Sequence, residues 1–178
     1  MDLKDNCTIV ILAGGKSERM GSDKALLFNS VKRIQKLSEE VGIQRCIVMC
    51  GSRDRKSLFE GEVWEDPEHS NSISELIKWL REEISGRIQL LPCDCYLLER
   101  SGLEFLLEMK SGVPIDGEGS RQPLMANFDA NSELVDSRTL NELFSNLDSY
   151  ENDQLVKQFS NFNTQEELNL ILSEEQNS

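Results

Sequence analysis

The segment at residues 12–27, LAGGKSERMGSDKALL, brings together the groups that a bound polyphosphate requires. Small residues let the backbone approach a ligand closely, so that successive N–H groups can surround an anion. Long cations can then neutralise phosphate charge through strong, charge-assisted hydrogen bonds. The small residues after Leu12 are Ala13, Gly14 and Gly15, and the cations are Lys16, Arg19 and Lys24. The spacing fits neither the GxxxxGK[ST] loop nor the GxGxxG fingerprint, and the alternative is a surface turn with ordinary charges.

Two aspartates follow predicted strands further along the chain. Asp66 comes after the brief strand at 62–65, and Asp94 comes soon after the strand at 88–91 and Pro92. The Asp94 carboxylate, beyond the end of a buried strand, could hold Mg²⁺, which prefers oxygen ligands. Two other roles stay open at this point, because Asp66 could begin a turn and Asp94 could cap a helix.

The elements that must position these residues follow one another in a regular alternation. Short β-branched and apolar runs predict strands, and apolar residues at helical spacing predict amphipathic helices. The predicted strands are 8–12, 45–50, 62–65, 88–91, 122–128 and 155–159, and the predicted helices are 31–41, 72–84, 102–109, 139–147 and 164–172. This alternation predicts a three-layer α/β fold with a mostly parallel sheet. Ligands bind such sheets at the carboxyl ends of the strands, so the loops after residues 12, 65 and 92 are the candidates.

Composition and charge restrict the class of protein. The chain has 178 residues, of which 38% are hydrophobic and 29% charged, as in a globular domain. Its net charge of −13 argues against nucleic-acid and membrane-surface binding, and no apolar run is long enough to span a bilayer. Residues 1–60 carry 11 Lys and Arg against 8 Asp and Glu, whereas residues 129–178 carry 2 against 11. The basic residues therefore cluster at the end that holds the glycine-rich segment.

The chain has five cysteines, an odd number, and its N-terminus lacks the pattern of a secretory signal. Both observations predict free thiols in a reducing, cytoplasmic environment. Cys93 and Cys95 flank Asp94, and we expect two free thiols there rather than a metal or redox pair. We also expect a single domain over residues 1–172, followed by a disordered tail at 173–178.

The glycine-rich segment closely resembles the LAGGxSxRMGxDK signature of the molybdenum cofactor guanylyltransferase family. Three later segments are similar to other motifs of that family: LPCDCY at 91–96, QPLMANF at 122–128 and FSNFNTQEEL at 159–168. The four matches occur in the family's order and cover most of the chain. The resemblance implies a Rossmann-like nucleotidyltransferase fold with a mixed, mostly parallel sheet.

The resemblance also implies a reaction, the transfer of GMP from GTP to the molybdopterin cofactor with release of pyrophosphate. The backbone of the loop from Leu12 through Ala13 and Gly14 to Gly15 would hold the nucleotide. The resemblance further implies that Lys24 and Arg19 contact phosphates and that Asp66 positions the nucleotide.

Mg²⁺ is the cofactor that the resemblance implies, with Asp94 as its protein ligand. Asn161 and Asn163 match asparagines on the pterin side of the family's cleft, although they could also be turn and cap residues. Besides GTP and the molybdopterin cofactor, the implied partners are molybdoenzymes or other cofactor-biosynthesis proteins.

The chain departs from the family's pattern in the half of the site that would hold the base and the acceptor. The family's GPLAG segment is replaced by NSISE at 71–75, the usual residues after the metal aspartate by Cys95 and Tyr96, and the GxPLL segment after Leu27 is missing. Two alternatives follow. One is a transferase of the same fold that uses another nucleotide, such as CTP, or another phosphorylated acceptor. The other is a diverged nucleotide- or cofactor-binding protein with little turnover.

Overall fold

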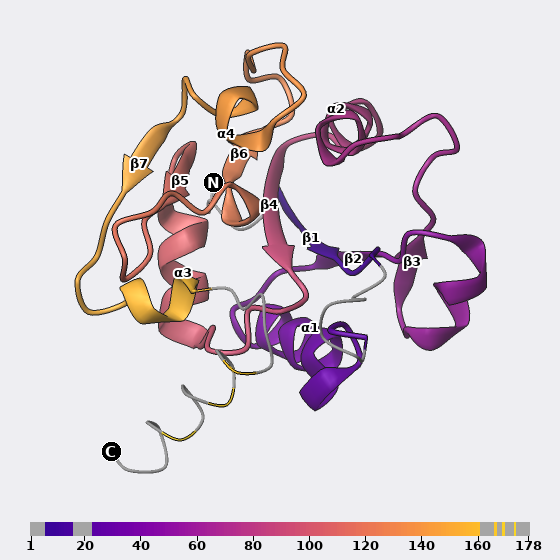
Figure 1. The fold of residues 1–178 in the computed structure, drawn as a ribbon, viewed down its shortest axis with the longest axis horizontal. Helices are drawn as coiled ribbons and strands as arrows, with labels where there is room; N and C mark the ends of the chain where they lie inside the picture. Colours follow the sequence, from indigo (N-terminus) through magenta and orange to yellow (C-terminus); the bar gives the residue numbers. More distant parts are fainter. Residues whose placement is uncertain (1–5, 16–22, 161–165, 167–168, 170–172, 174–178) are drawn as a thin grey trace.

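Four parallel strands form one side of the sheet (Figure 1). They are β1 (Cys7–Leu12), β2 (Arg45–Met49), β3 (Glu62–Trp64) and β4 (Arg87–Pro92), in the spatial order β3-β2-β1-β4, and β3 is the edge strand. Strands covered by helices on both faces are apolar throughout, and four successive residues of β1, from Thr8 to Ile11, are all buried. The computed structural model describes residues 6–15, 23–160, 166, 169 and 173.

Three short strands extend the sheet beyond β4 and make it mixed. β6 (Asn127–Asp129) pairs antiparallel with β4, β5 (Gly112–Pro114) pairs antiparallel with β6, and β7 (Asp148–Tyr150) pairs parallel with β5. The complete order is β3-β2-β1-β4-β6-β5-β7. The predicted α/β class with a mixed, mostly parallel sheet is confirmed.

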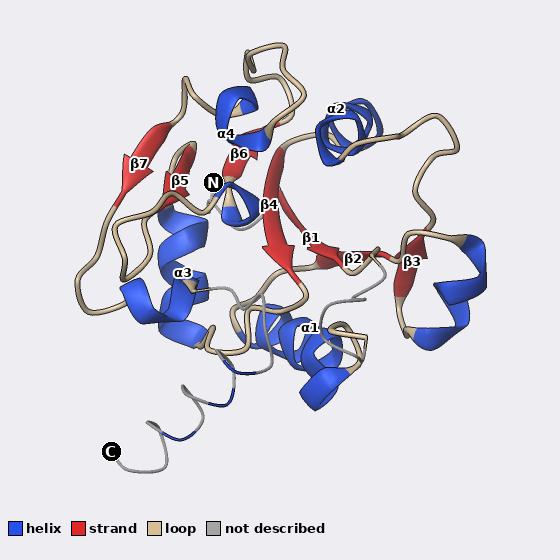
Figure 2. Cartoon of the chain, viewed as in Figure 1, coloured by secondary structure: helices blue, strands red, loops and turns tan. Residues whose placement is uncertain are grey.

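Helices cover both faces of this sheet (Figure 2). α1 (Ser30–Glu40) and α3 (Arg100–Glu108) lie on one face, where Ile34 and Leu103 share a core cluster with Ile9 of β1. α2 (Ile73–Glu83) and the short α4 (Leu140–Leu143) lie on the other, where Ile77 packs in a second cluster with Val10. Because adjacent residues of β1 point into different clusters, the three layers follow from the period of two in a strand.

The central elements were predicted to within two residues, but the C-terminal half needs corrections. The expected strand at 122–128 is a 3-10 turn at Pro123–Met125 followed by β6, because proline has no N–H to give to a strand ladder. The expected strand at 155–159 is a 3-10 helix, Val156–Phe159, whose buried Phe159 stacks on Phe105.

The helix expected at 139–147 is only α4, and β5 and β7 were not predicted. The helix expected at 164–172 and the tail at 173–178 lie almost entirely outside the described residues.

The order of the strands fixes where a ligand can bind. The chain leaves β1 toward β2 and β3 on one side, then returns to β4 on the other side of β1. A crevice forms at such a switch point, outside the carboxyl ends of the strands. No helix in the part of the chain that the structure describes is long and apolar enough to cross a membrane.

Candidate active site

The loop after β1 lies directly against the loop after β2. A Cβ atom on Gly14 would lie 2.7 Å from the Cα of Gly51, and one on Gly51 would lie 2.9 Å from the Cα of Gly14. Gly51 also has φ of +80°, a left-handed conformation that favours glycine. The two glycines therefore allow a backbone contact that no other residue permits, and this contact sets the position of the loop that begins at Ala13.

Asp66 joins the same place from the end of β3. Its N–H donates to the carbonyl of Gly51 at 2.8 Å, and its Oδ2 lies 3.4 Å from where a Cβ of Gly14 would be. Its Oδ1 is buried and has no hydrogen-bond partner among the described residues. Burial raises the pKa of the Asp66 carboxyl, an effect that a hydrogen bond to the backbone of Gly51 opposes. A buried acceptor with an open lone pair and a perturbed pKa is typical of a binding site.

A cavity of about 270 Å³ opens beside Gly14 and Asp66. Its walls are partly apolar, from Leu12, Met49, Ile73 and Leu76, and its rim is polar, from Asp66, Ser70, Asn71 and Ser72. A larger groove of about 910 Å³ lies along α1 and the amino-terminal ends of β2 and β3, at the opposite edge of the sheet. The smaller cavity is therefore the one that belongs to the switch point.

The start of α2 forms one side of the smaller cavity and is capped by a side chain. The Ser72 hydroxyl accepts a hydrogen bond from the N–H of Glu75 at 3.2 Å. The Glu75 carboxylate in turn accepts the N–H of Asn71 at 2.6 Å, one residue before the cap. This reciprocal pattern resembles a capping box, and the backbone N–H of Asn71 makes its hydrogen bond within the protein.

Lys24 and Asp94 meet across the crevice, although 70 residues separate them. The Lys24 Nζ lies 2.8 Å from the Asp94 Oδ2, and their side chains are 18% and 13% exposed. Asp94 lies two residues after the end of β4, and the N-cap of the next helix, α3, is Glu99, so the alternative role of Asp94 as a helix cap is wrong. The Tyr96 hydroxyl donates to the carbonyl of Lys24 at 3.0 Å and holds the lysine backbone beside the Asp94 loop.

α1 supports the loop that carries Asp94. The Arg33 guanidinium donates to the carbonyls of Leu98 at 2.5 Å and Cys95 at 2.6 Å. The Ser30 hydroxyl donates to the carbonyl of Cys93. Three carbonyls of residues 93–98 are thus held by side chains of one helix, which fixes the loop on both sides of Asp94.

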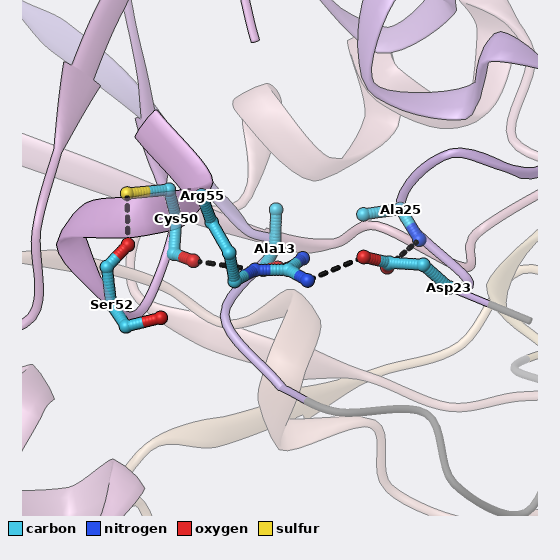
Figure 3. Close-up of polar contacts among 6 residues, drawn as sticks. All are labelled: Ala13, Asp23, Ala25, Cys50, Ser52 and Arg55. Atoms are coloured by element: carbon cyan, nitrogen blue, oxygen red, sulfur yellow. Dashed lines mark hydrogen bonds and ion pairs between the residues drawn. The ribbon is translucent and has the colours of Figure 1, made fainter. Parts of the chain in front are cut away.

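A third charged group, Arg55, lies between the loops after β1 and β2 (Figure 3). It belongs to the 3-10 helix Arg53–Leu58. Its guanidinium forms an ion pair with Asp23 and donates to the carbonyls of Ala13 and Cys50. Two ion pairs, Asp23–Arg55 and Lys24–Asp94, therefore lie near the carboxyl ends of β1 and β4.

The expectation of free thiols is confirmed, because all five cysteines are unpaired. Burial is the largest effect on the Cys93 thiol and, with the charge of Asp94, raises its pKa to about 12. The pKa of the Cys95 thiol is also raised by burial. Both residues therefore stay protonated near neutral pH, where a thiol is a poor nucleophile and metal ligand.

The structure brings most of the predicted residues together. Ala13 and Gly14 follow Leu12 at the end of β1 beside Asp66, and Lys24 meets Asp94. Gly15 follows Gly14 and is exposed. Arg19, Asn161 and Asn163 lie outside the described residues. The sequence alone assigns no role to Gly51, Asp23, Arg55 or Arg33. Asp23 stands within the signature-like segment, which was the one available signal.

Asp94 is the residue that could hold a divalent cation at this site. Within the described ranges, no three His, Cys, Asp or Glu side chains are grouped closely enough to form a metal cage. A single carboxylate fits Mg²⁺, which usually binds one or two carboxylates together with substrate phosphates and water. The donor set thus suits an ion that is held jointly by Asp94 and a phosphorylated ligand.

We expect Asp66→Asn to raise the stability of the protein at neutral pH. Because the pKa of Asp66 is raised in the folded state, its contribution to stability is present at low pH and is lost as pH rises through that pKa. The difference in Tm between Asp66→Asn and the wild type should therefore grow as the pH rises through the folded-state pKa of Asp66. A difference that is constant with pH would contradict the expectation.

The chain matches the family model of MobA-like NTP transferase domains over residues 9–143. No curated protein matches it in sequence. Among solved structures, it is similar to Rv0371c from Mycobacterium tuberculosis H37Rv, with a TM-score of 0.68 and 16% identity over 94% of this chain and 98% of that one. It is similar to a nucleotidyl transferase from Methanothermobacter (Mth528), with a TM-score of 0.67 and 16% identity over 94% and 96% of the two chains. A CMP:2-keto-3-deoxy-manno-octonic acid synthetase complexed with CTP has a TM-score of 0.64 and 12% identity over 96% and 100%.

Proposed function

We propose that this chain, which belongs to the family of MobA-like NTP transferase domains, transfers GMP from GTP to the molybdopterin cofactor and releases pyrophosphate. The observation that carries the proposal is the contact of Lys24 with Asp94 at 2.8 Å. The contact joins the cation that we assign to phosphate binding and the carboxylate that we assign to Mg²⁺. The glycine loop and Asp66 lie at the same edge of the sheet.

The two ion-paired side chains have complementary roles when the substrate binds. Lys24 exchanges the Asp94 carboxylate for phosphate oxygens, and Asp94 becomes available to a cation that accompanies the triphosphate. Each charge thus keeps an opposite partner before and after binding, which limits the cost of desolvation. When bound, Mg²⁺ would supply charge neutralisation at the phosphate oxygens.

The protein has little proton transfer to carry out in this reaction. A phosphate nucleophile is already ionised, so no general base is needed, and attack on the α-phosphorus releases pyrophosphate. The work of the site is to position the reactants and to stabilise charge. The backbone at Gly14 approaches the nucleotide, Asp66 accepts hydrogen bonds from its nucleoside part, and Lys24 stabilises charge on the departing pyrophosphate.

A specific observation favours a second candidate, a transferase of the same fold with a different nucleotide. The N–H of Asn71 at the rim of the 270 Å³ cavity is bonded to the Glu75 carboxylate. It is therefore not offered to a ligand, and Glu75 adds negative charge near the cavity. Both features differ from the family's GPLAG segment and would alter the selection of the base.

Binding of the four nucleoside triphosphates with Mg²⁺ tests the two candidates. We expect GTP to bind about tenfold more tightly than CTP, a difference of about 1.4 kcal/mol, as measured by calorimetric titration. Pyrophosphate release with molybdopterin cofactor present should follow the same order. A preference for CTP would favour the second candidate, and equal affinity for all four would contradict the guanylyl assignment.

A further inference from the structure

We propose that Arg55 is a positioning residue of the nucleotide site, which fixes Lys24 by tying Ala13 and Asp23 to the end of β2. The inference rests on the proposed function for the ligand, and on the described residues for the contacts. Arg55 itself does not touch the substrate in this proposal. It acts on Lys24 through Asp23.

The three contacts of the guanidinium come from three separate parts of the chain. The Arg55 Nη2 donates to the carbonyl of Ala13 at 2.8 Å, and the Nε donates to the carbonyl of Cys50 at 2.9 Å. The Nη1 donates to the Asp23 carboxylate (Figure 3). Ala13 and Asp23 are ten residues apart in the glycine-rich segment, and one planar group contacts both of them. A rigid fork of donors suits this task, because its N–H groups point in fixed directions.

Asp23 transmits this constraint to its neighbour in sequence. Its Oδ1 accepts the N–H of Ala25 at 3.0 Å, and its carbonyl accepts the N–H of Leu26 at 3.0 Å. Lys24 lies inside this tight turn and is held at a second point by the Tyr96 hydroxyl. The backbone of Lys24 is therefore fixed on both sides, and its side chain starts from a defined place.

The surroundings of Arg55 fit a positioning role better than a role as phosphate ligand. The side chains of Arg55 and Asp23 are 13% and 21% exposed, and the guanidinium lies 5.9 Å from the ring centroid of Phe59. All three of its nitrogens donate to acceptors of the protein. A cation used in this way fixes Ala13, Asp23 and Cys50 relative to one another before the substrate arrives, as an effective site requires.

Arg55→Lys is the informative substitution, because lysine keeps the charge but has no planar fork. Arg45→Lys is the matched control. Arg45 also forms a two-point pair, with Glu62 at 2.8 and 3.1 Å, but at the amino-terminal edge of the sheet. A general effect of losing an arginine fork would appear in both variants, whereas the positioning effect should appear only in Arg55→Lys.

The first measurement is amide hydrogen exchange of the ligand-free protein. In Arg55→Lys we expect the N–H groups of Ala25 and Leu26 to exchange about tenfold faster, with no such change in Arg45→Lys. Unchanged exchange at these amides would overturn the proposal. This measurement does not depend on which ligand the protein binds.

The second measurement is the affinity for Mg²⁺-GTP, well below Tm. We expect Arg55→Lys to weaken binding about tenfold in the wild-type background and to have no further effect in Lys24→Ala. Equal losses in both backgrounds would mean that Arg55 does not act through Lys24, and an unchanged affinity would mean that its role is only structural. Either result overturns the proposal. If the wild type binds no nucleoside triphosphate, the proposed function fails, and so does the role of Arg55 in nucleotide binding. The exchange data then still decide whether the contacts of Arg55 order the backbone around Lys24.

Discussion

Asp94→Asn is expected to reduce the kcat of nucleotidyl transfer by about a hundredfold or more, the usual cost of removing a group that stabilises transition-state charge. Asparagine has the shape of aspartate but lacks the charge that a Mg²⁺ ligand supplies. Its side-chain oxygen can still accept a hydrogen bond from Lys24, which lies 2.8 Å from the present carboxylate. We therefore expect Tm to change little, and the variant to require more Mg²⁺ for the activity that remains.

Pyrophosphate release as a function of Mg²⁺ concentration, together with Tm, checks this expectation. Asp116→Asn is a control with the opposite outcome. The buried Asp116 carboxylate accepts the N–H groups of Glu118 and Ser120 and the Gln122 side chain in a tight turn. Its replacement should lower Tm and leave kcat unchanged. Near-normal, Mg²⁺-dependent turnover by Asp94→Asn would refute the metal role.

Gly14→Ala should weaken nucleotide binding by about a hundredfold, since a misplacement of about 1 Å in a site can have an effect of that size. The added Cβ would lie 2.7 Å from the Cα and 2.8 Å from the N of Gly51. Both are backbone atoms, so no side chain can rotate away and the two loops must separate. Overpacking of this kind also costs about 1–3 kcal/mol of stability. Calorimetric titration with Mg²⁺-GTP and thermal denaturation measure the two effects.

Gly117→Ala serves as the control for this substitution. A Cβ on Gly117 would meet only the Val156 Cγ2, at an ordinary distance of 3.8 Å. Its stability should stay within about 0.5 kcal/mol of the wild type, and its nucleotide affinity should not change. If Gly14→Ala behaved in the same way, the contact with Gly51 would not determine the shape of the loop.

The elements of the central sheet could be predicted because their patterns are local. β1, β2 and β4 are short apolar runs, and α1, α2 and α3 repeat apolar residues at helical spacing. β5 and β7 have only three residues each, too few to show an alternation. The segment at 155–159 has apolar residues at both ends and polar residues between them, a spacing that suits a helical turn.

The site was predictable only where the rule for parallel sheets applies. That rule places the residues after β1, β3 and β4 at one edge, and the loops with Gly14, Asp66 and Asp94 lie there. Arg55 could not be found in this way, because it stands in the run Arg53–Lys56, where nothing in the sequence separates one cation from the next. Its partners, at Ala13, Asp23 and Cys50, are defined by the path of the chain between strands.

The contact between Gly14 and Gly51 restricts how this chain can diverge by mutation. A side chain at either glycine would collide with the backbone of the other glycine. A substitution at one position therefore cannot be compensated by a later substitution at the other, whichever comes first. The start of α2 is held differently, through the side chains of Ser72 and Glu75. Such contacts can be exchanged one residue at a time, with each intermediate still folded. The two sides of the crevice thus have unequal mutational freedom, and new ligand preferences are far more accessible through the α2 side.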